Sequence, residues 1–145
     1  VFEDVKPILE KIAKEIFLLH TPSSATKMKL INNLCLGSFM ATLAECTALA
    51  ENCDIPKAKA LEILGVGGGQ SLVLKAKTQK LIDEDFSAHF SNNAINKDLH
   101  LLQDLAYNLK LPLYSACVPK ELFSKMKMMG KGEEDFSSIY QLFKK

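Results

Sequence analysis

The stretch from Thr21 to Asp54, TPSSATKMKLINNLCLGSFMATLAECTALAENCD, decides the fold of this chain. Pro22 fixes φ, and the hydroxyls of Ser23 and Ser24 can cap the first free N–H groups of a helix. The residues that follow include no proline before Pro56, and Gly37 is their single glycine. Apolar residues fall on more than one face, so neighbouring helices must bury this helix from several sides. The sequence therefore predicts a central helix roughly 40 Å long with the other helices packed around it.

Polar residues interrupt the apolar pattern near the start of this helix. Lys29 and Asn33 are four residues apart and share a face, and Gly37 continues the same line one turn later. A cation, an amide and a missing side chain predict a notch for a small anionic or carbonyl-bearing molecule. The alternative is a solvated lysine near a helix end and an amide satisfied by the protein.

Length, net charge and residue composition argue against several classes of function. The 145 residues are enough for one domain with a core, and the net charge of +1 gives no strong field for nucleic acid or an acidic membrane. No uninterrupted apolar run reaches the ~20 residues of a membrane span. The cysteines and histidines form no CxxC motif or regularly spaced cluster, so the sequence predicts no metal site and a reducing, cytoplasmic compartment. The first residue is valine, which suggests that the chain begins inside a longer protein.

The segment before the central helix has a different character. Residues 1–15 have helical apolar spacing, and Ile16–Leu19 form a short apolar run suited to a buried strand. A helix and one strand cannot make a sheet alone, so residues 1–20 are predicted to be the end of an α/β domain. The alternative is that the run extends the helix or packs as a loop.

The rest of the chain is predicted to be helical. Helices are expected at about 56–64, 70–82, 92–110, 114–129 and 133–145, with a kink or late start at Pro119. The glycines of Gly65–Gly69 resemble a phosphate loop, but no Gly-Lys-Ser/Thr follows, so a helix stop is the better interpretation. Phe86 and Phe90, in the connecting segment after the second of these helices, are expected to fill the core.

Several motifs resemble those of the β-hydroxyacid dehydrogenases, which include 3-hydroxyisobutyrate dehydrogenase and the glyoxylate/succinic semialdehyde reductases. The resemblance covers nearly the whole chain and is carried by Lys27–Asn33, Gly37–Glu45, Asp85-Phe86 with Phe90, Lys97-Asp98-Leu99, and Gly130–Ser137. It implies an all-α fold, a bundle like the C-terminal domain of 6-phosphogluconate dehydrogenase, over residues 21–145. It also implies that residues 1–20 are the last helix and strand of a dinucleotide-binding domain.

The resemblance also implies roles for individual residues. Lys29 would be the catalytic acid/base and Asn33 an amide that orients the substrate. Ser23 would contact the substrate, although the family has glycine there and at Ala25. Lys97 and Phe90 would lie on the cofactor side. The implied substrate is a small hydroxyacid or semialdehyde, and NAD or NADP would be bound mainly by the N-terminal domain.

A second hypothesis is a non-catalytic helical oligomerisation module of a larger protein. Long helices with broad apolar faces also suit a dimer or tetramer interface. In relatives that resemble such a module the catalytic lysine is replaced, so the presence of both Lys29 and Asn33 favours the enzyme. A homodimer or homotetramer is expected under either hypothesis.

Overall fold

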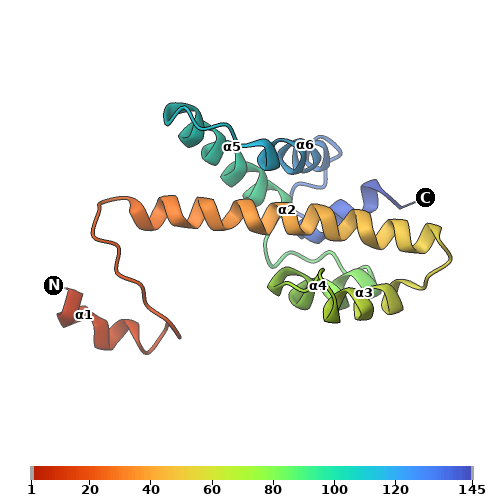
Figure 1. Ribbon diagram of the computed structural model, residues 1–145, viewed down its shortest axis with the longest axis horizontal. Helices are drawn as coiled ribbons and strands as arrows, with labels where there is room; N and C mark the ends of the chain where they lie inside the picture. The colour runs from red at the N-terminus through yellow and green to blue at the C-terminus, as the bar shows by residue number, and fades with distance from the viewer. Residues whose placement is uncertain (1, 145) are drawn as a thin grey trace.

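The computed structural model describes residues 2–144 and confirms an all-α architecture (Figure 1). Within these residues the backbone forms no strand, and Ser91 and Asp135 share an isolated β-bridge. The elements are α1 (Phe2–Leu9), α2 (Ser24–Asn52), α3 (Lys57–Val66), α4 (Leu72–Asp83), α5 (Asn92–Asn108), α6 (Tyr114–Met128) and the 3₁₀ helix η1 (Phe136–Leu142).

The central helix predicted from Thr21–Asp54 is α2, the longest element of the bundle. It packs against α3, α4, α5, α6 and η1, with α5 and α6 on one side and α3 and α4 on the other (Figure 1). By length and composition α2 is also the one helix of the described chain that could cross a membrane, which a search for uninterrupted apolar runs misses. Here it is the core helix, because its buried residues contact five other elements.

Gly37 brings α2 and α5 into close contact. A Cβ atom at this position would lie 3.2 Å from Leu99 Cδ1 and 3.5 Å from Ile95 Cδ1, both on α5. The prediction that Gly37 forms part of an open notch is therefore wrong. The space left by the missing side chain is filled by the neighbouring helix.

The start of α2 differs from the predicted capping. Ser23 is the N-cap residue, but its side chain makes no capping hydrogen bond, and its backbone is left-handed with φ of 65°. A side chain in this conformation costs roughly 1–2 kcal/mol relative to the right-handed region, a cost that glycine avoids. The backbone geometry thus gives a physical reason for a glycine at this position.

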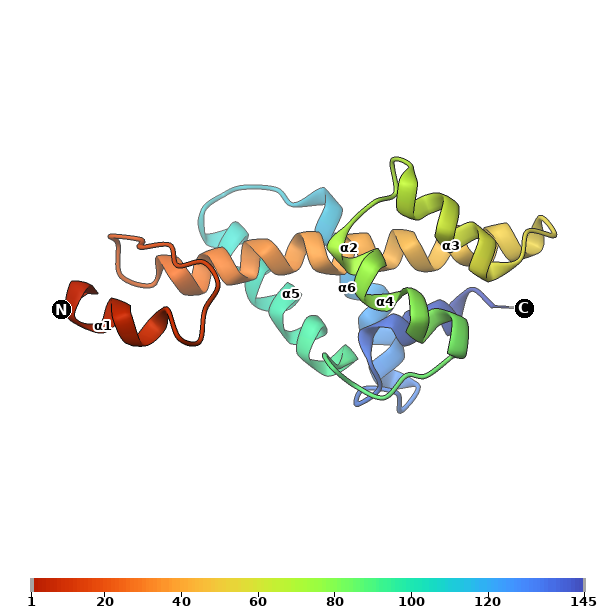
Figure 2. The same cartoon turned by 90° about the horizontal axis from the view of Figure 1, so that it is seen from below.

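The structure also contradicts the helix length and the strand predicted for the N-terminal segment. Helix α1 ends at Leu9 instead of about residue 15, and Ile16–Leu19 form no strand. Within the described residues α1 packs on no other element, and it lies apart from the bundle, beyond the start of α2 (Figure 2). Ile12 and Phe17 are 81% and 82% exposed. A strand needs a neighbouring strand for its hydrogen bonds, and the described residues place none beside Ile16–Leu19.

The later helices follow the prediction with small changes, except that the last is the 3₁₀ helix η1 (Phe136–Leu142) and not a helix over 133–145. Helix α3 continues through Gly65 to Val66, so the predicted stop comes two residues later. Helix α6 starts at Tyr114 and continues past Pro119, so the late start is not seen. Proline at 119 cannot donate to the carbonyl of Ser115, and the Ser38 hydroxyl of α2 donates to that carbonyl instead, at 3.3 Å.

A buried ion pair joins α4 to the residue that precedes η1. Asp135 is fully buried and lies 2.8 Å from the Lys77 ammonium of α4, and it accepts from the backbone N–H of His89 at 3.0 Å. Burial raises the pKa of this carboxyl, but the hydrogen bonds from Lys77 and Ser137 outweigh burial and hold it below its ordinary value. Asp135 also caps η1, because its carboxylate accepts a hydrogen bond from the backbone N–H of Ser137 at 3.1 Å.

The conformation of Ser23 leads to a stability prediction. Ser23→Gly should raise the free energy of unfolding by up to about 1 kcal/mol, because relief of the left-handed backbone exceeds the entropy that glycine adds to the unfolded chain. Ala25→Gly, inside the first turn of α2, should lower it by about 0.5–1 kcal/mol. Urea unfolding of the two variants beside the parent would measure both changes. Equal destabilisation by both glycines would contradict the role given to φ at Ser23.

Candidate active site

Four polar residues meet where the first turns of α2 lie against α5. Lys29 and Asn33 come from one face of α2, and Lys97 and Asp98 come from the second turn of α5. Ile95, Leu99 and Leu102 lie on one buried face of α5. This face packs on α2 and holds the two helices side by side. Asp98 falls on this packed face, so its carboxylate enters the contact between the helices.

The Asp98 carboxylate is the centre of the cluster. Its side chain is 2% exposed, and its Oδ2 atom lies 2.7 Å from the Asn33 amide nitrogen and 3.0 Å from the Lys29 ammonium. Its Oδ1 atom lies 3.5 Å from the Lys97 ammonium. Because a carboxylate only accepts hydrogen bonds, the Asn33 side chain must present its NH₂ group to Asp98. This leaves the Asn33 oxygen for another donor.

Asp98 is ionised at neutral pH. Burial raises the pKa of its carboxyl, but the hydrogen bond and charge of Lys29, with the Asn33 amide and Lys97, outweigh burial and hold it below the ordinary value of 3.8. A buried carboxylate is tolerated when it is paired and hydrogen-bonded, and all three partners here supply donors.

The Lys29 ammonium contacts the Asp98 carboxylate on one side and is exposed to solvent on the other. Its side chain is 58% exposed, while the carboxylate that it contacts is buried. The side chain is therefore directed by Asp98 and still offers donor N–H groups to a molecule at the surface. This arrangement can present a proton donor and a positive charge at a defined place.

Of the other predicted site residues, Lys97 joins the cluster, whereas Ser23 and Phe90 lie elsewhere in the structure. Lys97 joins the cluster through Asp98, with its side chain 65% exposed. Ser23 is exposed at the start of α2 and makes no side-chain cap, six residues before Lys29. Phe90 is half-buried in the α4–α5 connection, and its ring lies edge-on to Phe136 at 5.7 Å. The structure thus unites Lys29, Asn33 and Lys97 and shows Phe90 packing on the core, as its expected core-filling role requires.

Asp98 is the residue that the sequence interpretation left out of the site. Its position was visible in the pattern, because it follows Ile95 by three residues and precedes Leu102 by four, on the apolar face of α5. A carboxylate on a buried face needs a cationic or donor partner. That signal could have identified it as the partner of Lys29.

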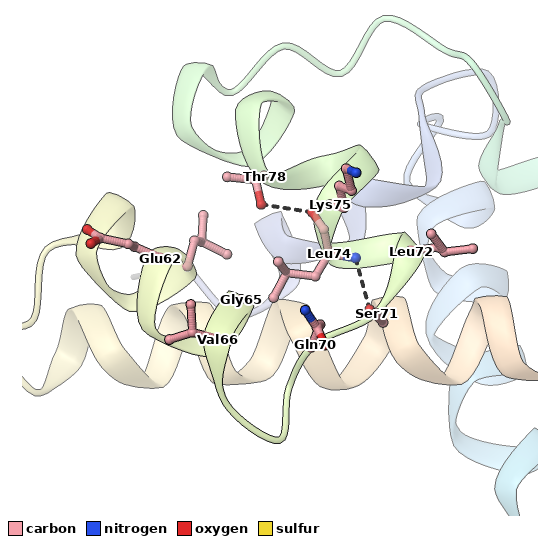
Figure 3. A pocket seen from close by; sticks show the side chains of 10 residues that line it. Glu62, Gly65, Val66, Gln70, Ser71, Leu72, Leu74, Lys75 and Thr78 are labelled. Carbon is pink, nitrogen blue, oxygen red and sulfur yellow. Dashed lines mark hydrogen bonds between the residues drawn. The ribbon is translucent and has the colours of Figure 1, made fainter.

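The larger hollows lie away from this cluster. One of about 740 Å³ lies between α3 and α4, lined by apolar side chains such as Val66 and Leu74 and by polar ones such as Glu62, Lys75 and Thr78 (Figure 3). The described residues contain no group of three or more His, Cys, Asp or Glu side chains placed to hold a metal ion. The Lys29 cluster is therefore an open surface site built from lysines, an amide and one buried carboxylate.

Comparison with known proteins identifies the family. The profile described as NAD-binding of NADP-dependent 3-hydroxyisobutyrate dehydrogenase matches residues 23–143. The chain belongs to the 3-hydroxyisobutyrate dehydrogenase family. Members of this family are NAD(P)-dependent oxidoreductases of hydroxyacids, and their cofactor is NAD or NADP.

Curated relatives include enzymes and a nuclear protein. The chain is 32% identical over 144 residues to 2-(hydroxymethyl)glutarate dehydrogenase from Eubacterium barkeri, covering 99% of this chain and 48% of the relative. It is 29% identical over 143 residues to L-threonate dehydrogenase from Escherichia coli, covering 98% and 47%. It is 31% identical over 143 residues to the cytokine-like nuclear factor N-PAC from Homo sapiens, covering 99% and 26%. The chain spans about half the length of these dehydrogenases.

Solved structures of the family share the fold. A 3-hydroxyisobutyrate dehydrogenase from Salmonella typhimurium aligns with a TM-score of 0.92 at 28% identity, covering 97% of this chain and 50% of that one. The Mycobacterium tuberculosis 3-hydroxyisobutyrate dehydrogenase with L-serine aligns with a TM-score of 0.87 at 20% identity, covering 99% and 52%. At that identity the second match shows the fold alone.

The geometry of Asp98 predicts acid sensitivity. A carboxyl with a lowered folded pKa contributes stability above its unfolded pKa, and this stability is lost as the pH falls through the folded value. Asp98→Asn should therefore lower the free energy of unfolding by about 1–3 kcal/mol at pH 7 and reduce its slope between pH 5 and 3. Asp104→Asn, an exposed acid on the same helix, is the matched control. Urea unfolding across this pH range would show it, and an unchanged slope in Asp98→Asn would contradict it.

Proposed function

We propose that this chain is the C-terminal, substrate-side domain of an NAD(P)-dependent reductase or dehydrogenase of small hydroxyacids or semialdehydes. The observation that supports it best is the Lys29 ammonium, held 3.0 Å from a buried carboxylate and open on its other side. Asn33, one turn along α2, shares the same carboxylate at 2.7 Å. These are the two residues that the family resemblance implies as proton donor and substrate-orienting amide.

The chemistry follows from the charges in the cluster. The nicotinamide, when bound, supplies or accepts the hydride at the carbinol carbon. In reduction, the Lys29 ammonium donates a proton to the substrate oxygen and stabilises the negative charge that develops there; in oxidation the neutral Lys29 amine accepts that proton and becomes the ammonium. Asn33 orients the substrate through its free amide oxygen, and Asp98 keeps both side chains in place.

The remaining assignments belong to the same proposal. Lys97 contacts the cofactor or substrate region, Phe90 lies on the cofactor side, and Ser23 contacts the substrate. Residues 1–20 end a dinucleotide-binding domain whose missing part closes over Lys29, so the 145-residue chain alone does not turn over. The whole protein assembles as a homodimer or homotetramer. Its compartment is the reducing cytoplasm, which the four unpaired cysteines support.

The role of Lys29 is tested in the full-length protein. Lys29→Ala should lower kcat by about 10²–10⁴, the usual contribution of a positioned proton donor, while the Kd for NAD(P)H stays within about twofold. Steady-state rates and cofactor fluorescence titration measure the two quantities.

Lys27→Ala is the matched control, because it removes a neighbouring ammonium from the same turn and should retain most of the rate. Near-normal kcat in Lys29→Ala would rule out the proposed proton transfer. A parallel loss of cofactor binding would point to misfolding or a binding role instead.

A non-catalytic oligomerisation module stays as the second candidate, because the nuclear factor N-PAC is nearly as similar to this chain as the dehydrogenases. The module hypothesis predicts no turnover with any small hydroxyacid or semialdehyde, with either NAD(H) or NADP(H), in the full-length protein. Activity that depends on Lys29 would exclude it.

A further inference from the structure

Two buried lysines of α4 contact the segment that leads into α5, residues 84–91, directly or through a carboxylate. Lys77 and Lys80 are three residues apart and share a face of α4. They are only 5% and 8% exposed. A lysine is rarely buried unless its ammonium is paired, so the groups that each ammonium contacts indicate what the lysine does.

Lys80 fixes the first half of this segment. Its ammonium donates to the backbone carbonyl of Ser87 at 2.7 Å and to the Ser87 hydroxyl at 3.0 Å. It also donates to the backbone carbonyl and the carboxylate of Asp85, both at 3.3 Å. Ser87 precedes Phe90 by three residues, so a different contact must fix the second half.

Lys77 fixes the second half through Asp135. The Lys77 ammonium donates to Asp135 Oδ2 at 2.8 Å. The same oxygen accepts from the backbone N–H groups of His89 at 3.0 Å and Phe90 at 3.3 Å. Asp135 is fully buried, and a buried carboxylate stays ionised only when it is paired with a cation or with several donors. Because an ionised acceptor makes the stronger hydrogen bonds, Lys77 strengthens the contact that holds the backbone of Phe90.

The residue after Asp135 holds the rest of Phe90. The backbone N–H of Phe136 donates to the Phe90 carbonyl at 2.9 Å, and the two rings lie edge-on with centroids 5.7 Å apart. The Lys77 ammonium lies 4.9 Å from the centroid of the Phe136 ring, within the range of a cation–π contact. Lys77 therefore contacts both residues that fix Phe90.

Phe90 is held more firmly than a residue that only fills the core would need to be. It is half-buried, yet its backbone N–H, its carbonyl and its ring each contact Asp135 or Phe136. It also lies just before α5, about two helical turns from Asp98. A partly exposed aromatic ring on a fixed backbone is suited to packing against a planar ligand, because its position is set before the ligand binds.

We propose that Lys77 is a positioning residue for Phe90, and that through Asp135 and Phe136 it raises the affinity of the full-length protein for NAD(P)H. This rests on the proposed function, in which Phe90 lies on the cofactor side. The proton donor Lys29 is placed by a different carboxylate, Asp98. Loss of Lys77 should therefore weaken cofactor binding more than it lowers the rate at saturating cofactor.

Hydrogen exchange in the full-length protein tests the positioning. Lys77→Met removes the ammonium and keeps an apolar side chain of nearly the same length. Peptides covering residues 86–91 should exchange about tenfold faster than in the parent, because the hydrogen bonds from His89 and Phe90 to Asp135 open more often. If Lys77→Met does not fold, Phe136→Leu takes its place, since it removes the ring that contacts Phe90 and keeps the core apolar.

Lys57→Met is the matched control. Lys57 also lies close to a carboxylate and a ring, with its ammonium 2.8 Å from Glu84 and 4.5 Å from the centroid of Tyr140. Its side chain is 13% exposed, so the same substitution removes a similar pairing from another part of the bundle. Exchange of residues 86–91 should stay within about twofold of the parent in this variant.

Cofactor fluorescence titration and steady-state rates test the consequence. Lys77→Met should raise the Kd for NAD(P)H at least about fivefold, while kcat at saturating cofactor stays within about twofold. Lys57→Met should leave both values near those of the parent. Melting of the two variants is measured alongside, because a merely structural role would make the loss of cofactor affinity follow the fall in Tm in both.

Two outcomes would overturn the proposal: unchanged exchange of residues 86–91 in Lys77→Met, or the same Kd in Lys77→Met as in Lys57→Met. Phe90→Leu separates the proposal from the function on which it rests. A parent-like Kd in Phe90→Leu would remove Phe90 from the cofactor side and overturn the effect on affinity for that reason. The exchange measurement depends only on the contacts of Asp135 and Phe136, so it shows separately whether the positioning itself has failed.

Discussion

The contact on which the site depends is the one between Asp98 and the pair Lys29 and Asn33. A carboxylate buried between two helices is strongly destabilising without partners, and its three donors come from both helices. The same ion pair therefore joins α2 to α5 and fixes the position of the Lys29 ammonium. Gly37 makes the contact possible, because a side chain there would push against Leu99 and Ile95 one turn further along. The pairing of Asp98 thus both stabilises the contact between α2 and α5 and fixes the position of the Lys29 ammonium.

A second buried acid holds the element that carries Asp98. Asp135 binds Lys77 and the backbone N–H groups of His89 and Phe90, and thereby fixes the chain just before α5. The Asn92 backbone N–H donates to the Glu134 carbonyl at 3.0 Å, so the first residue of α5 is attached to the C-terminal segment as well. The beginning of α5 is thus anchored about two turns from Asp98. Asp135 and Glu134 thus act on the site by fixing this helix, without touching Lys29.

Local patterns predicted much of the fold and half of the site. The long proline-free run gave α2, and spacing four residues apart placed Lys29 and Asn33 on one face, since both follow from helix geometry alone. What escaped prediction depends on contacts between distant segments. Asp98 meets Asn33 and Lys29 across 65 and 69 residues, and the space at Gly37 is filled by a helix whose position no local pattern gives. The strand expected at Ile16–Leu19 is not formed for the same reason, because a strand needs neighbouring strands for its hydrogen bonds and the described residues contain none.

The exposure of Lys29 bears directly on the proposed chemistry. In open water an ammonium interacts only weakly with a developing alkoxide, by about 1 kcal/mol at 4 Å, whereas a site closed to water strengthens the same interaction several-fold. The helical bundle covers the Asp98 side of the lysine and leaves the other side open. A second lobe covering that side would strengthen the proton transfer proposed for Lys29. The exposed apolar residues of the segment before α2, such as Phe17, have the same requirement for a covering partner. One neighbouring domain would meet both needs, and for this reason an open Lys29 in residues 2–144 agrees with a catalytic role.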